Sequence, residues 1–181
     1  KPLLEYYGKI EAKSEENVIV HKCWNNQFIE NLKWYLGSIN GYYIISDPDI
    51  MPHPNTPPNF LEIFKDAIDN KGFHRAGFGL ITDDLPEELN EREMIIGNEK
   101  ELLNQPIPFY FNEKRYDGFK APLDTTFCLY KRDNGGWSSP MNGNDWGNCL
   151  RLFKAQHLGW YINPNFINEE MDFYFKSAKY R

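Results

Sequence analysis

Short apolar runs separated by turn residues dominate the pattern of hydrophobic and polar positions along the chain. The run "YYIIS" at 42–46 is the clearest, because its first four residues are all apolar. Runs of this length, rich in β-branched and aromatic side chains, are typical of strands. We therefore predict strands at 17–24, 42–46, 74–81, 108–116 and 124–132.

Apolar residues at helical spacing lie between several of these runs. In the segment 59–69, Phe60, Ile63, Phe64 and Ala67 fall on one face of a helix. Glycines and prolines near the ends of the periodic segments are typical helix boundaries. The pattern predicts helices at 2–12, 26–39, 59–69 and 87–104.

Strands and helices alternate in the first half of the chain, whereas the second half has more strand and loop. An apolar strand such as 42–46 is typical of a parallel sheet covered on both faces. The sequence therefore predicts an α/β fold with a mostly parallel central sheet flanked by helices, and a smaller antiparallel portion. A chain of 181 residues fits one domain over 1–181.

Composition and charge narrow the classes of function. Hydrophobic residues make up 41% of the chain, enough for a sizeable core. The net charge of −6 argues against broad binding to nucleic acid or to anionic membranes, because no basic excess neutralises phosphates. The sequence has no apolar run long enough to span a bilayer, so we expect no transmembrane segment.

The three cysteines, Cys23, Cys128 and Cys149, have no C-x-x-C spacing. Reduced thiols in an intracellular protein are the plain interpretation, and we expect a cytoplasmic location. The chain begins at Lys1 rather than Met, which favours a processed form or a part of a larger multidomain chain.

Asp47 and Asp49 follow the strand at 42–46 in the sequence S-D-P-D. Ligands of open α/β sheets bind beyond the carboxyl ends of the strands. Two carboxylates at such an edge suit Mg²⁺ or Mn²⁺, either of which would bind diphosphate oxygens. The alternative is an ordinary turn, because aspartate and proline are common turn residues.

Three further positions are candidates for chemistry, each with a simpler alternative. His157 is a candidate metal ligand or a structural histidine. Asp84, in "ITDDLP", would accept a proton from a hydroxyl group, or Asp83-Asp84 would cap a helix that starts at Pro86. Asp124, in "LDTTF", would act as the base or only cap a strand.

Other residues would line a nucleotide site. A base or ribose would contact the side chains after the first predicted strand, and cationic side chains near His157 would offset diphosphate charge. Solvent exposure without a ligand is the alternative for these cations. The candidates for this nucleotide site are Trp24, Asn25, Asn26, Asp47, Arg151 and Lys154.

Four segments occur in a specific order: "YYIISDPDIMP", "AGFGLITDDLP", "LDTTFCLYKR" and "HLGWY". Together they resemble a bacterial and chlorovirus group of glycosyltransferases with the GT-A (Rossmann-like) fold and a D-x-D motif. The resemblance implies a hexosyltransferase of glycan biosynthesis. It would move a sugar from a nucleotide-diphosphate sugar, a UDP-sugar as first choice, to a hydroxyl acceptor such as a glycan.

The resemblance also implies roles for residues of this chain. Asp47, Asp49 and His157 would hold Mn²⁺ or Mg²⁺, and Asp124, or as second choice Asp84, would face the acceptor. The halves 1–83 and 84–181 would bind the nucleotide sugar and the acceptor. A viral member of the group would act in the host cytoplasm.

One departure and two alternatives stay open. Enzymes of this group open with a strand that meets the nucleotide base, and nothing strand-like precedes the helix predicted at 2–12. A metal-dependent nucleotidyltransferase or other phosphoryl-transfer enzyme also needs clustered carboxylates, but normally shows a glycine-rich phosphate loop. A non-catalytic carbohydrate-binding module would explain the aromatic content of 16%.

Overall fold

The computed structural model describes residues 41–47, 49–123, 126–132, 148–162 and 169. The chain divides into two compact units, and the unit Ile39–Tyr161 contains every element described below. Its elements are β1 (Gly41–Ile45), β2 (Ile50–Pro52), α3 (Phe60–Lys71), β3 (Arg75–Leu80), α4 (Arg92–Leu102), β4 (Pro106–Phe111), β5 (Lys114–Lys120), β6 (Cys128–Arg132), β7 (Cys149–His157) and the 3₁₀ turn η1 (Leu158–Tyr161).

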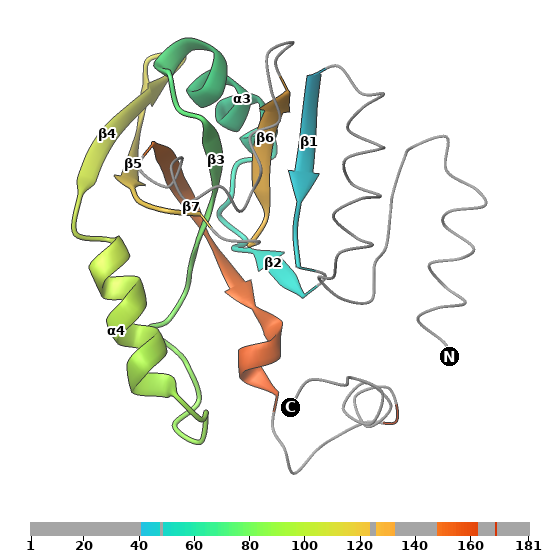
Figure 1. Cartoon of the computed structure of the whole chain (residues 1–181), viewed down its shortest axis with the longest axis vertical. Coiled ribbons are helices and arrows are strands. Elements are labelled where there is room, and N and C mark those ends of the chain that lie inside the picture. The colour runs from blue at the N-terminus through green and yellow to red at the C-terminus, as the bar shows by residue number, and fades with distance from the viewer. Residues whose placement is uncertain (1–40, 48, 124–125, 133–147, 163–168, 170–181) are drawn as a thin grey trace. The chain divides into compact units, whose positions relative to one another are not determined.

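The seven described strands form one mixed sheet in the order β1–β6–β3–β7–β5–β4, with β2 paired to β7 off this path (Figure 1). Among them only β3 and β7 run parallel, and the other pairs are antiparallel. Two α-helices accompany the sheet in the described residues. The predicted GT-A-like, mostly parallel sheet flanked by helices is therefore wrong, since the sheet is mostly antiparallel.

Strand β1 shows why the prediction failed. Its apolar sequence favoured a central parallel strand, but it pairs antiparallel with β6, with Gly41 opposite Arg132. At Ile44 the side chain is 42% exposed, so the strand is not covered on both faces. An apolar run indicates burial, whereas the direction of a partner strand distant in sequence is not encoded locally.

Individual elements were predicted with mixed success. The strands at 42–46 and 74–81 and the helix at 59–69 are confirmed within one or two residues. The strand predicted at 108–116 is a hairpin, because Asn112 and Glu113 turn the chain with φ angles of 48° and 64°. Strands β2 and β7 were not predicted, and the elements expected within 1–40 lie outside the described residues.

Helix α3 covers one face of the sheet and forms the hydrophobic core with it. Ile63, Phe64 and Ala67 on the helix are fully buried against the strands, and Phe78 of β3 belongs to the same cluster. The rings of Phe64 and Phe78 meet edge to face with centroids 5.4 Å apart. The apolar stripe predicted from the sequence is therefore the stripe that the helix buries.

Hydrogen bonds to Asp69 attach the last turns of α3 to the sheet. Its carboxylate accepts hydrogen bonds from the hydroxyl of Tyr42 on β1 and from Nζ of Lys131 on β6, the latter at 2.6 Å. The Lys131 bond is the main cause that lowers the pKa of Asp69. Burial, followed by the bond to Asp69, raises the pKa of Tyr42. The helix thus has a polar attachment to β1 and β6 beside its apolar one.

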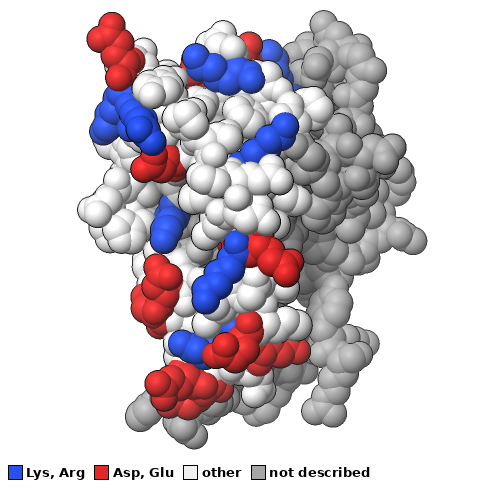
Figure 2. All heavy atoms as spheres, turned by 90° about the vertical axis from the view of Figure 1, so that its left-hand side faces the viewer, with Lys and Arg blue, Asp and Glu red and all other residues white. Residues whose placement is uncertain are grey.

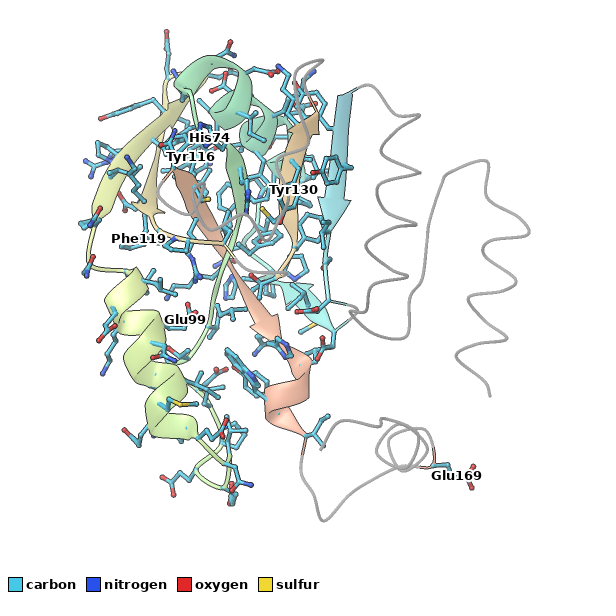
Figure 3. The ribbon with its side chains drawn as sticks, in the orientation of Figure 1. His74, Glu99, Tyr116, Phe119, Tyr130 and Glu169 are labelled. Carbon is cyan, nitrogen blue, oxygen red and sulfur yellow. The ribbon has the colours of Figure 1, made fainter. Side chains whose placement is uncertain are left out.

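The opposite face of the sheet, called the polar face below, buries the guanidinium groups of Arg75 and Arg151 beside the side chains of Cys128, Tyr130 and Cys149. Alternate residues of β3 on this face are Arg75, Gly77 and Gly79. The guanidinium of Arg75 lies 5.1 Å from the ring centroid of Tyr130, whose place on β6 is labelled in Figure 3. A Cβ on Gly77 would lie 2.5 Å from the carbonyl oxygen of Phe127, so the glycine lets the chain that leads into β6 lie close against β3.

A β-bulge in β7 sets which side chains share this polar face. Gly77 pairs with Arg151 and the next residue, Phe78, pairs with Phe153, so Leu152 is the extra residue. Leu152 and Phe153 both join the hydrophobic cluster. The alternation therefore restarts after the bulge, so that Lys154 and Gln156 lie on the face of Arg151 and Ala155 lies on the face of the core.

Helix α4 is attached to the sheet by a buried ion pair. Within α4, all of which is described, only Glu99 is buried, and Figure 3 shows it on the side toward the sheet. Its Oε2 accepts a hydrogen bond from Nη1 of Arg151 at 2.7 Å, and Nε of Arg151 donates to the carbonyl of Pro122 at 2.8 Å. Met94 on the same helix is 53% exposed. The ion pair replaces the apolar stripe that usually holds a surface helix.

The outer surface of this region carries charges of both signs. On the face turned to the viewer in Figure 2, acidic and basic side chains are interspersed. Neither described helix is long and apolar enough to cross a membrane.

Replacement of Glu99 by alanine should lower the free energy of unfolding by about 3 kcal/mol, because Arg151 would stay buried without its counter-charge. Urea denaturation followed by circular dichroism measures the change. The matched control is Glu93→Ala on the same helix, where the side chain is 86% exposed in its pair with Arg92. That control should stay within about 0.5 kcal/mol of the parent. Equal effects of the two variants would show that the buried pair does not hold α4.

Candidate functional site

The carboxyl ends of the parallel strands β3 and β7 lie at the same edge of the sheet. Asp83 and Asp84 follow the end of β3, and Gln156 and His157 end β7. Strand β2 brings Asp49 to this edge, because its first residue pairs with His157. The topology therefore gathers residues from three of the four segments that the sequence singled out.

Asp49 and His157 form a close pair of candidate ligands. Oδ2 of Asp49 lies 3.2 Å from Nδ1 of His157, and the two side chains are 34% and 22% exposed. The geometry of this contact is not that of a hydrogen bond, and Nδ1 is a buried atom without a hydrogen-bond partner among the described residues. A buried polar atom in this state is unusual, and a bound water or a cation would each account for it.

The turn η1 fixes both members of the pair. The amide of Leu158 donates to the carbonyl of Asp49 at 2.8 Å, and the amide of Gly159 donates to its Oδ2 at 3.0 Å. The indole of Trp160 stacks on the imidazole of His157, with centroids 5.0 Å apart and planes 13° apart. The carboxylate and the imidazole are therefore oriented before any ligand binds.

Gly159 is required by this close approach. A Cβ at position 159 would lie 2.7 Å from Oδ2 of Asp49 and 3.2 Å from Nδ1 of His157. Approaches shorter than 3.0 Å essentially never occur for real Cβ atoms, so the carboxylate would have to move. The glycine in "HLGWY" thus allows the backbone amide to reach the carboxylate.

The Asp49–His157 pair fits a divalent cation. Two ligands at right angles, each about 2.1 Å from a cation, lie about 3.0 Å apart, close to the separation observed. Magnesium-type sites keep several waters and use one or two carboxylates with substrate phosphates, so two protein ligands suffice. No group of three or more His, Cys, Asp or Glu side chains within ligating range occurs in the described residues. Asp47, half-buried in the connection after β1, is therefore not brought into a three-residue set with them.

Asp84 is held in one orientation by two donors. The hydroxyl of Tyr161 donates to its Oδ1 at 2.6 Å, and Nε2 of Gln156 donates to its Oδ2 at 3.3 Å. Burial of the phenol, followed by its bond to Asp84, raises the pKa of Tyr161 to about 12. The side chain of Asp84 is fixed although the residue is exposed.

The helix-capping alternative for Asp83-Asp84 is wrong. Helix α4 begins at Arg92, and its N-cap position is Glu91. Asp83 instead lies 3.5 Å from Nζ of Lys154, with both side chains exposed. The two aspartates therefore belong to the sheet edge and not to a helix terminus.

The two predicted cationic residues have different surroundings. Arg151 is 4% exposed, and its guanidinium is bound by Glu99 and by the carbonyl of Pro122. The side chain of Lys154 is 54% exposed at the edge that holds Asp83. Of the pair, Lys154 is the one that a phosphate in solution can reach.

Other predicted residues lie outside the described residues, namely Trp24, Asn25, Asn26 and Asp124. Two described neighbours of Asp124 are unusual. Phe127 has a φ of 60°, a strained value for an aromatic residue, and the hydroxyl of Thr126 is buried without a hydrogen-bond partner in the described residues. Strain and unpaired groups of this kind gather at functional sites.

Sequence reasoning missed the supporting residues Gln156 and Tyr161. Both flank His157 in "AQHLGWY", so their proximity in sequence was the available signal. Their partner Asp84 comes from a distant segment, and only the sheet shows the contact.

No protein-family model, curated protein or solved structure matches this chain. The resemblance to glycosyltransferases rests on the four quoted segments.

Replacement of Gly159 by alanine should displace the Asp49 carboxylate and lower the free energy of unfolding by about 1–2 kcal/mol, because the added methyl group overlaps Oδ2. Urea denaturation measures the change. The control is Gly97→Ala in α4, where an added Cβ meets nothing within 4 Å. That control should raise stability by about 0.5–1 kcal/mol. A Gly159→Ala variant as stable as the parent would contradict the close approach of Gly159 to Asp49.

Proposed function

We propose that the chain is a metal-dependent glycosyltransferase that moves a sugar from a nucleotide-diphosphate sugar to a hydroxyl acceptor. The observation that carries the proposal is the Asp49–His157 pair, with its 3.2 Å separation and its buried, unpartnered Nδ1 among the described residues. Carboxylate and neutral imidazole together suit Mn²⁺, and Mg²⁺ is the alternative. The motif resemblance supplies the reaction class, and a UDP-sugar is the first donor to test.

Asp49 and His157 would hold the cation, and η1 would hold these two residues in place. When bound, a divalent cation neutralises negative charge on a leaving diphosphate. Lys154, whose ammonium is exposed at the same edge, would add a positive charge for the diphosphate. These three residues define the donor side of the proposed site.

The acceptor hydroxyl must lose its proton during transfer, and a carboxylate can accept it. Asp124 is the first choice from the sequence, and Asp84 is the candidate among the described residues. The bonds from Tyr161 and Gln156 orient Asp84 but leave its residue exposed, so a hydroxyl group in solution can approach an oxygen of the carboxylate. A base that activates the acceptor for direct attack would invert the anomeric centre.

Isothermal titration calorimetry with Mn²⁺, with and without UDP, tests the proposal. The parent protein should bind Mn²⁺, and Asp49→Asn and His157→Ala should each weaken binding at least about tenfold, because each removes a ligand. Asp117→Asn is the matched control, since the Asp117 side chain is 81% exposed on β5. It should bind Mn²⁺ as the parent does.

The same protein distinguishes the alternative functions. Absence of Mn²⁺ binding by the folded parent would contradict the proposal. Binding of glycans without metal or nucleotide would instead indicate a carbohydrate-binding module. Release of pyrophosphate, rather than of a sugar, from the bound substrate would indicate nucleotidyl transfer.

A further inference from the structure

We propose that η1 couples the cation pair to Asp84, so that Tyr161 is a positioning residue for Asp49 and His157 although its hydroxyl is bound to Asp84. The inference rests on the proposed function, because it concerns the cation that this function requires. It adds that the Tyr161–Asp84 contact, on the side where the acceptor would bind, influences the affinity of the cation site.

Every residue of η1 contacts either the Asp49–His157 pair or Asp84. Leu158 and Gly159 hold Asp49 through their amides, and Trp160 stacks on His157. The last residue, Tyr161, donates its hydroxyl to Asp84 at 2.6 Å. A single turn of four residues therefore links β2 and β7 to the segment that follows β3.

The coupling depends on the shortness of the turn. In a 3₁₀ turn of four residues, the backbone of one residue can move little without moving the others, because all four belong to the same tight turn. Tyr161 is two residues from Gly159, so movement of its backbone would shift the amide that holds Oδ2 of Asp49. Loss of the Asp84 contact should loosen the turn and with it the orientation of both cation ligands.

Coupling of this kind is reciprocal. If the Tyr161–Asp84 bond strengthens cation binding, then bound cation must strengthen the Tyr161–Asp84 bond by the same factor. Loading of the donor side would thereby fix the Asp84 carboxylate for the acceptor.

The test measures Mn²⁺ affinity by calorimetry in the intact chain. Tyr161→Phe should weaken Mn²⁺ binding about fivefold, a typical coupling between two sites. The matched control, Tyr110→Phe, removes a phenol hydroxyl from a residue that is 51% exposed on β4, and should leave the affinity unchanged. Thermal melting of each variant verifies that it is folded.

Asp84→Ala removes the acceptor of the Tyr161 hydrogen bond. It shows whether the effect of Tyr161→Phe depends on that bond or on a general loosening of η1. In the Asp84→Ala background the further change Tyr161→Phe should have no effect on Mn²⁺ affinity, because the bond is already absent. An unchanged affinity in Tyr161→Phe, or an equal fivefold loss in both backgrounds, would overturn the coupling alone. Failure of the parent protein to bind Mn²⁺ would overturn the proposed function, and the coupling with it.

Discussion

The described structure depends most on the pairing of β7, which contacts β2, β3 and β5 at once. Its parallel pairing with β3 places the carboxyl ends of both strands at one edge of the sheet. Its antiparallel pairing with β2 brings Asp49 next to His157. The extra residue Leu152 then decides which side chains enter the core and which join the polar face. The candidate site exists because these three pairings meet on one strand.

The two faces of the sheet are stabilised by different physical interactions. On one face α3 buries an apolar stripe against Phe78 and its neighbours. On the other face, the Arg151–Glu99 pair holds α4. Removal of two charges from water is costly, and the direct bonds to both groups offset that cost. Lys154 and Gln156 continue this face toward Asp83 and Asp84, whereas alternation turns His157 to the face of Ala155, so the candidate site spans both faces at the edge of the sheet.

Local patterns in the sequence predicted those parts of the structure that local physics determines. The helical stripe of Ile63, Phe64 and Ala67 predicted α3. The motif resemblance, not a local pattern, grouped Asp47, Asp49 and His157, and of these the structure brings Asp49 and His157 to 3.2 Å. Strand direction was missed because β1 meets a partner far away in the sequence. Arg151 was interpreted as a solvated or ligand-binding cation because its counter-charge, Glu99, lies on a helix distant in the sequence.

Strand β7 was missed for a related reason. Its bulge places Leu152 and Phe153 side by side in the core, which interrupts the alternation that marks a strand. Gly159 and Tyr161 orient Asp49 and Asp84 through a backbone amide and a phenol, and the segment "HLGWY" that contains both does not show which carboxylate each one contacts.

Anomalous diffraction from crystals soaked in Mn²⁺ tests most directly whether Asp49 and His157 share one cation. We expect an anomalous peak within about 2.5 Å of both Oδ2 of Asp49 and Nδ1 of His157. Mn²⁺ bound elsewhere in the crystal, with no peak in contact with this pair, would contradict a shared cation.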